Sequence, residues 1–186
     1  PRLKSALAEL EDPARIPEAE LAAGADDAAV VLHRRAPLAG ADAARLQAFQ
    51  SAAGVAVATL GPGEAEPRPL DAARTPDLYY RLPGEGLTLR FAATDFVQAN
   101  PAVNRLLVER VMALLAPAPG ARVLDLYCGI GNFALPAARR GATVTGIDAD
   151  PGLIGRAAAN AAGNGLEGHA RFDAADLGAP GAERRL

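Results

Sequence analysis

Val123-Leu-Asp-Leu-Tyr-Cys-Gly-Ile-Gly-Asn-Phe133 is the stretch of sequence that decides the fold. Residues 122–127 are mainly apolar and predict a buried strand. Gly129 and Gly131 predict a tight turn in which the backbone can approach a ligand, and a helix is expected from about Asn132 to Arg140. A strand that passes through a glycine turn into a helix is the place where open α/β sheets bind their ligands.

Strands and helices alternate on both sides of this stretch. Asn100 is a good N-cap, and Pro101 suits the first position of a helix that ends before Pro117. The apolar residues of this expected helix recur at helical spacing. They are Val103, Leu106, Leu107, Val111, Leu114 and Leu115. Two further strands, at 143–147 and 170–172, flank a helix that begins at Asp150-Pro151 and ends near Gly163. Crossover helices between strands predict a parallel, doubly wound sheet.

Residues 1–76 have a different pattern and predict a small α+β domain that precedes the α/β domain of residues 77–186. Its elements are expected at Leu3–Leu10, Arg15–Ala22, Ala28–Arg35, Ala41–Ala53 and Val55–Leu60. Residues 61–76, rich in Pro, Gly and charge, predict a loop or linker, and residues 78–91 predict a hairpin around Pro83-Gly84-Glu85. His33, beside Arg34 and Arg35, either contacts RNA or lies on an exposed edge strand.

Composition excludes several classes of protein. The formal charge of −3 argues against a nonspecific polyanion binder, but Lys4 is the only lysine among nineteen basic residues, and arginine suits RNA. Cys128 is the only cysteine, so an intrachain disulfide and a cysteine-rich metal site are excluded, and no metal is expected. No leader or membrane-spanning run is visible, which predicts a cytoplasmic protein. The ends at Pro1 and Leu186 are interpreted as cuts within a longer protein.

The glycine loop also matches a dinucleotide fingerprint, because Gly129, Gly131 and Ala134 satisfy its spacing. Asp125, four residues before the first glycine, favours another cofactor. A carboxylate there would repel a pyrophosphate, whereas it would attract the ammonium and sulfonium groups of S-adenosylmethionine. An ordinary αβ turn would explain the glycines but not a carboxylate in an apolar strand, since a buried charge is costly unless it is paired.

Two further acids are candidate cofactor ligands. Asp148 ends the second strand, near the spacing expected for an acid that binds ribose hydroxyls. Capping of the next helix is better assigned to Asp150. Asp176 follows the third strand, where it could accept a hydrogen bond from the adenine amino group. Asp173 is a competing candidate for that role.

With these residues in view, the chain resembles the RNA 5-methyluridine (uracil-C5) methyltransferases, and among them the bacterial 23S rRNA branch. Two motifs carry the resemblance: Asp95-Phe-Val-Gln-Ala-Asn100 and Leu124-Asp-Leu-Tyr-Cys-Gly-Ile-Gly-Asn-Phe133. Many methyltransferases share the second loosely, and the first is more specific to this family. The resemblance implies a Rossmann-like S-adenosylmethionine-dependent methyltransferase sheet, incomplete here. It implies cofactor contacts from Gln98, Tyr127, Asn132, Asp148 and Asp176.

The family reaction adds a cysteine thiolate to C6 of the uracil, C5 takes the methyl group, and a carboxylate base removes the C5 proton. The resemblance implies that this nucleophile and base lie beyond Leu186. Cys128 lies in the cofactor loop and is not interpreted as the nucleophile. The expected partner is 23S rRNA, with no DNA or membrane partner, and the protein is expected to be a monomer. A methyltransferase acting on another substrate, and a noncatalytic S-adenosylmethionine- or RNA-binding module, remain alternatives.

Overall fold

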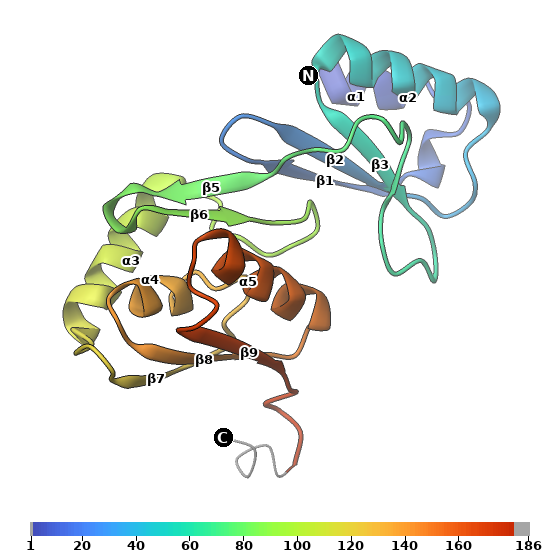
Figure 1. The fold of residues 1–186 in the computed structure, drawn as a ribbon. Coiled ribbons are helices and arrows are strands. Elements are labelled where there is room, and N and C mark those ends of the chain that lie inside the picture. Colours follow the sequence, from blue (N-terminus) through green and yellow to red (C-terminus); the bar gives the residue numbers. More distant parts are fainter. Residues whose placement is uncertain (1, 181–186) are drawn as a thin grey trace. The chain divides into compact units, whose positions relative to one another are not determined.

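Residues 2–180, which the computed structural model describes, fold as two units (Figure 1). Within these residues, the first unit extends to Leu78 and includes Ala92–Thr94, and the second comprises Tyr79–Phe91 and the residues from Asp95 onward. The segment between the two parts of the first unit therefore contributes a hairpin to the second. Residues 181–186 of the second predicted domain lie outside the described residues.

The first unit is a four-stranded sheet with two helices on one face (Figure 1). The strand order is β1-β2-β3-β4, with β2 and β3 parallel and the outer pairs antiparallel. A parallel pair needs a crossover, which α2 supplies between β2 and β3. The elements are α1 (Arg2–Ala8), a 3-10 turn (Pro13–Arg15), β1 (Glu18–Ala23), β2 (Ala28–His33), α2 (Gly40–Ala53), β3 (Ala56–Leu60) and β4 (Arg68–Pro69).

The core of this unit lies between the helices and the sheet. Val30 and Leu32 from β2 are buried with Leu46 from α2. The expected exposed edge strand at His33 is wrong, because β2 pairs with β1 on one side and with β3 on the other. Arg15 likewise ends the 3-10 turn and does not begin the strand.

The segment of residues 61–76 is attached more firmly than a linker. Its β4 residues pair with β3, and Leu70 donates its backbone N–H to Val57 O at 2.9 Å. Arg74 donates two hydrogen bonds to the Asp27 carboxylate, at 3.0 and 2.7 Å. The Arg74 guanidinium holds the pKa of Asp27 below its usual value. The polar composition of residues 61–76 predicted a loop. Long-range pairing, which composition does not reveal, holds this segment in place.

The second unit contains the predicted parallel sheet, in the order β7-β8-β9. Helices α4 and α5 both pack on one face of this sheet (Figure 1). All three strands run in the same direction, so their carboxyl ends meet at one edge. The elements are β5 (Tyr79–Leu82), a 3-10 turn (Pro83–Glu85), β6 (Leu87–Arg90), α3 (Pro101–Leu115), β7 (Arg122–Leu126), α4 (Ala134–Arg139), β8 (Thr143–Asp148), α5 (Pro151–Gly163) and β9 (Ala170–Ala174).

The expectation that the first of these strands is buried is only half right. Val123 and Asp125 are partly covered, but Arg122, Leu124 and Leu126 are exposed. Within residues 2–180, β7 forms one edge of the sheet and helices cover only one sheet face. Alternate residues of a strand point to opposite faces, so every second residue of β7 is left open.

Two asparagines attach the β5–β6 hairpin to α5. Asn160 and Asn164 lie one helical turn apart, and Arg90 and Thr88 lie two residues apart on β6, so the two spacings match. Asn160 accepts from Arg90 N at 2.8 Å and donates to Arg90 O at 3.0 Å. Asn164 makes the same pair of bonds with Thr88, at 3.0 and 2.8 Å. The two amides therefore bond to β6 as a neighbouring strand would.

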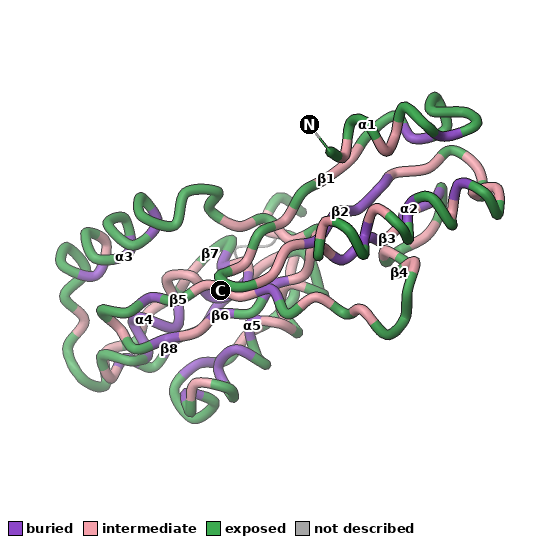
Figure 2. Tube along the Cα trace, turned by 90° about the horizontal axis from the view of Figure 1, so that it is seen from above, coloured by how far each residue is buried: buried purple, intermediate pink, exposed green. Residues whose placement is uncertain are grey.

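Helix α3 begins and ends as predicted but buries a different face. The Asn100 side chain accepts hydrogen bonds from the backbone N–H groups of Ala102 and Val103, which confirms the predicted cap. The buried residues are Asn104, Val108 and Met112, one turn apart. Figure 2 shows the helix largely exposed. The expected apolar stripe is mostly open, with side chains such as Leu106 and Leu114 exposed by 65% and 69%. No helix among residues 2–180 is both long and apolar enough to cross a membrane.

Gly146 of β8 is a position where a side chain has no room. A Cβ atom there would lie 2.5 Å from Phe172 Cδ1 and 2.9 Å from Cys128 Sγ. Gly146→Ala is expected to lower the free energy of unfolding by about 1–3 kcal/mol, because overpacking displaces both neighbours. Urea denaturation followed by circular dichroism measures the change.

Gly155 of α5 is the matched control, since a Cβ atom there meets nothing within 4 Å. Gly155→Ala is expected to raise stability by about 0.5–1 kcal/mol, as alanine does within a helix. Equal stability of Gly146→Ala and the parent chain would contradict the packing argument.

Candidate cofactor site

The loop between β7 and α4 is built from left-handed backbone. Tyr127, Gly129 and Gly131 have φ angles of 59°, 54° and 95°. The glycines adopt such angles at no steric cost, but a tyrosine there is uncommon. Tyr127 nevertheless exposes 70% of its surface at the carboxyl end of β7. Strained residues of this kind gather at ligand-binding loops. The exposed ring of Tyr127 therefore lies where a ligand is expected.

Asp125 provides the clearest chemical signal in this loop region. Its Oδ2 atom is buried and has no hydrogen-bond partner among the described residues. Burial raises the pKa of this carboxyl to about 6, the backbone N–H of Ala134 opposes the rise, and the charge of Asp148 adds to it. An unpaired buried carboxylate oxygen is costly, and a cationic or hydrogen-bond-donating ligand would relieve that cost.

Asp148 connects the glycine loop to the end of β8. Its Oδ2 accepts the backbone N–H of Gly129 at 3.0 Å, and its Oδ1 accepts that of Asp150 at 3.1 Å. Asp150 caps α5, as predicted, by accepting from Gly152 N at 2.6 Å and Leu153 N at 3.3 Å. A carboxylate has about four lone-pair sites, so Asp148 can hold the loop and still accept from a ligand hydroxyl.

Asn132 lies in a network of side chains that joins three elements. Its Oδ1 accepts from the Tyr80 hydroxyl at 2.8 Å and from Asn104 Nδ2 at 3.0 Å, and its Nδ2 donates to Asn104 Oδ1 at 3.0 Å. Burial raises the pKa of the Tyr80 phenol, which therefore stays a donor. These bonds use one of the two amide hydrogens of Asn132, so the second can still serve a ligand.

The remaining predicted residues lie at two other places in the second unit. Gln98 is exposed in the irregular segment that precedes α3. Asp176 is exposed after the end of β9, where its Oδ1 accepts from Gly178 N at 2.8 Å. Asp173 lies within β9 on the open sheet face, 4.0 Å from Arg171 Nε. Of the two competing acids, only Asp176 follows the carboxyl end of its strand.

Asp95 has a positioning role that its sequence position did not reveal. Its side chain is only 3% exposed and forms an ion pair with Arg156 of α5. Asp95 opens the motif that contains Gln98 and Asn100, so this ion pair attaches the start of that motif to the helix that follows β8. The sequence indicated Asp95 only through its place at the start of this motif. Its partner Arg156 lies 61 residues away and was not predictable from spacing.

Cys128 is unsuited to nucleophilic attack. Its thiol is buried, and its pKa is raised to about 12 by burial and then by the nearby carboxylates of Asp125 and Asp148. A thiol with that pKa is protonated at neutral pH, whereas the thiolate is the nucleophilic form.

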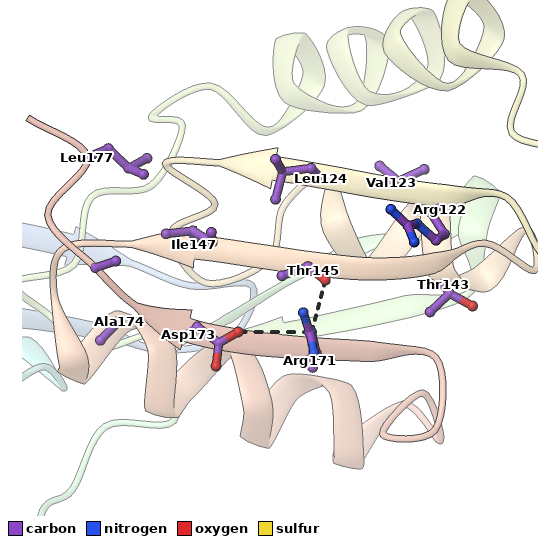
Figure 3. A pocket seen from close by; sticks show the side chains of 11 residues that line it. Arg122, Val123, Leu124, Thr143, Thr145, Ile147, Arg171, Asp173, Ala174 and Leu177 are labelled. Atoms are coloured by element: carbon purple, nitrogen blue, oxygen red, sulfur yellow. Dashed lines mark hydrogen bonds and ion pairs between the residues drawn. The ribbon is translucent and has the colours of Figure 1, made fainter. Parts of the chain in front are cut away.

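A large hollow lies on the open face of the β7-β8-β9 sheet (Figure 3). It encloses about 670 Å³ and is lined by side chains such as Leu124, Thr145 and Arg171. None of the eight predicted cofactor residues is among its lining residues. Ligands of open α/β sheets bind at the carboxyl ends of the strands, so the glycine loop is the better candidate site.

Comparison with known proteins agrees with the fold. A methyltransferase domain family matches residues 123–184. The structure resembles the tRNA (uracil-54, C5)-methyltransferase of Pyrococcus abyssi, solved with S-adenosyl-L-homocysteine, at a TM-score of 0.63 and 20% identity, over 94% of this chain and 45% of that one. It also resembles TYW2 of P. horikoshii, at a TM-score of 0.53 and 19% identity, over 97% and 65%. The predicted fold class, a Rossmann-like methyltransferase sheet that is incomplete in this chain, is confirmed.

Proteins related by sequence share a higher sequence identity with this chain. The chain is 44% identical over 177 residues to a protein of Azoarcus sp. (strain BH72) named 23S rRNA (uracil(1939)-C(5))-methyltransferase RlmD, covering 95% of this chain and 41% of that protein. A protein of the same name from Aromatoleum aromaticum is 46% identical over 164 residues, covering 88% and 38%. The chain thus spans about two fifths of the length of these curated relatives.

Proposed function

We propose that this chain belongs to the RNA uracil-C5 methyltransferase family, as the S-adenosylmethionine-binding part of an enzyme that methylates C5 of a uracil in 23S rRNA. The proposal includes a monomeric protein that acts on RNA, not DNA, in the cytoplasm. Support for the substrate comes from relatives that cover nine tenths of the chain, and support for the cofactor comes from the loop after β7.

The unpaired Oδ2 of Asp125 is the observation that carries the cofactor assignment. S-adenosylmethionine has a sulfonium and an ammonium group, and either is attracted to a buried carboxylate. A dinucleotide would bring a pyrophosphate to the same glycine loop, where Asp125 and Asp148 would both repel it.

The other predicted residues have fitting roles within this proposal. Asp148 would accept from ribose hydroxyls and Asp176 from the adenine amino group. Tyr127 would offer its exposed ring, and Gln98 and Asn132 would donate or accept at the rim. Gly129 and Gly131 would allow close approach of the backbone. When bound, the cofactor supplies the methyl group.

Chemistry on the uracil needs a thiolate that this chain does not offer. Cys128 is its only cysteine, and burial keeps that thiol protonated. We therefore expect this 186-residue chain to bind the cofactor without methylating rRNA. Transfer of a labelled methyl group to 23S rRNA by this chain alone would contradict that expectation.

Calorimetric titration with S-adenosylmethionine and with NAD tests the cofactor assignment. We expect binding of the first only, weakened about tenfold or more in Asp148→Ala, because a hydrogen bond to a charged group contributes about 1.5–3 kcal/mol. Asp173→Ala is the matched control, since this acid lies on the open sheet face. Binding of NAD instead, or an equal loss in both variants, would refute the proposed site.

A further inference from the structure

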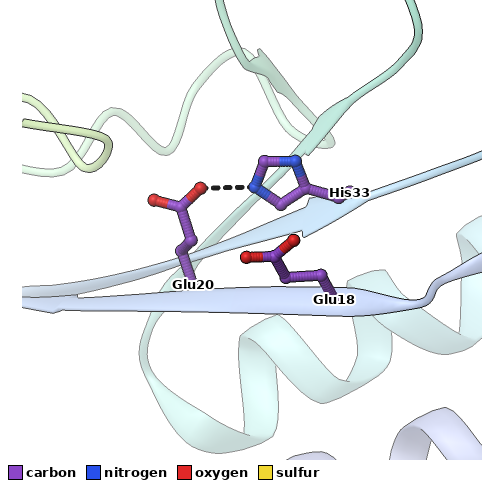
Figure 4. A group of neighbouring side chains, drawn as sticks. All are labelled: Glu18, Glu20 and His33. Carbon is purple, nitrogen blue, oxygen red and sulfur yellow. Dashed lines mark hydrogen bonds and ion pairs between the residues drawn. The ribbon is translucent and has the colours of Figure 1, made fainter.

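Three potential metal ligands gather on the first unit (Figure 4). Glu18 and Glu20 lie two residues apart on β1, so their side chains share one face of the sheet. His33 of β2 is the direct cross-strand partner of Glu18. The neighbours Ala19 and Leu32 belong to the core under the helices, which places the three polar side chains on the opposite face.

The ligand atoms of these three side chains are close enough to share one ion. One imidazole nitrogen and one oxygen from each carboxylate all lie within 4.8 Å of one another. Nε2 of His33 already contacts Oε1 of Glu20. Zinc binds imidazole nitrogen and carboxylate oxygen at about 2.0–2.2 Å, so ligand atoms on one ion lie up to about 4 Å apart. Small rotations of the exposed Glu18 side chain would close the remaining gap.

The charges of the cluster also favour a cation. Two carboxylates held this close repel each other, and a single imidazole, even when protonated, balances only one of them. Arg34, the chain neighbour of His33, is engaged elsewhere, because it pairs with Glu64 at 2.6 Å. A divalent ion would balance both carboxylates.

We propose that Glu18, Glu20 and His33 form a binding site for a divalent transition-metal ion, with Zn²⁺ as the preferred occupant. Imidazole selects first-row transition metals over Mg²⁺ and Ca²⁺, and carboxylates complete a set of hard and borderline ligands. Three protein ligands leave a fourth position for water. The ion would cross-link the edge strand β1 to β2. The single cysteine excludes only a cysteine-rich metal site, and this ligand set contains no cysteine. The proposal is independent of the cofactor site.

Calorimetric titration of the 186-residue chain with Zn²⁺ tests the site, with Co²⁺ absorption as a second readout of the ligand set. We expect one ion per chain. His33→Ala, Glu20→Gln and Glu18→Gln should each weaken binding by about tenfold or more, since losing an outer-sphere partner alone costs 10–100-fold. The only other histidine is the exposed His169 of the second unit, so His169→Ala is the matched control and should bind as the parent does.

Circular dichroism on each variant shows whether it is folded. Glu18→Gln is the decisive variant if His33→Ala does not fold, because Glu18 is exposed. No saturable binding below about 1 mM Zn²⁺ would overturn the proposal. So would an affinity that falls in His169→Ala and is unchanged in the folded cluster variants.

Discussion

Asn160→Ala is expected to lower the free energy of unfolding of the second unit by about 3 kcal/mol or more. The side chain is 4% exposed and makes three hydrogen bonds, with Arg90 N, Arg90 O and Ile130 O. A buried polar group that loses its partner costs about 1–3 kcal/mol. Since natural domains are stable by only about 5–15 kcal/mol, this loss is large. Urea denaturation of the chain measures it.

Ala159→Asn, at the exposed neighbouring position of α5, is the control for helix propensity and should cost less than about 1 kcal/mol. The carbonyl of Ile130 belongs to the glycine loop, so Asn160→Ala should also weaken S-adenosylmethionine binding. A loss of stability no greater than that of the control would show that the hairpin does not depend on the asparagine amide.

Asp125 should make stability fall as pH rises. Its folded-state pKa is raised from 3.8 to about 6, so ionisation of this group opposes folding. The effect is absent below about pH 4, develops between pH 4 and 6, and is complete above pH 6. Because one pKa unit corresponds to about 1.4 kcal/mol, the full effect is of the order of 3 kcal/mol.

The comparison of Asp125→Asn with the parent chain isolates this effect. Relative to the parent, the variant should gain about 3 kcal/mol in unfolding free energy between pH 4 and pH 7, as measured by urea denaturation at each pH. Asp173→Asn, which replaces an exposed acid of β9, is the control variant for removal of a carboxylate. A pH-independent difference for Asp125→Asn would mean that the carboxyl is not strained by burial.

The same variant also tests the cofactor proposal. Asp125→Asn should bind S-adenosylmethionine at least about tenfold more weakly at pH 7.5, because the ligand loses a buried carboxylate partner. A variant that gains stability at neutral pH and loses affinity would show that the unpaired oxygen serves binding at the expense of folding. Unchanged affinity would mean that the positive groups of the cofactor do not bind beside Asp125 of β7.

Local sequence determined most of the helices and strands of this protein and their order. Asn100 and Asp150 cap their helices, and a proline follows each of them in the sequence. A side-chain oxygen at a helix start accepts hydrogen bonds from free backbone N–H groups, whatever residues surround the helix. Gly129 and Gly131 favoured the turn, because a residue without a Cβ atom adopts positive φ angles at no steric cost. Steric and capping effects act within a few residues, so they can be predicted from the sequence.

Tertiary structure alone decided which faces are buried and which polar groups meet. Six apolar residues predicted one face of α3, yet the helix buries Asn104, whose partner Asn132 lies 28 residues away. In the sequence, Asn160 is indistinguishable from an ordinary helical asparagine, because its hydrogen-bonding role depends on β6, which lies beside it in the folded chain. The unpaired oxygen of Asp125 likewise arises from its burial in the folded chain. Hydrogen bonding, burial and charge depend on neighbours in space, and strand register brings His33 beside Glu20, where sequence spacing could not.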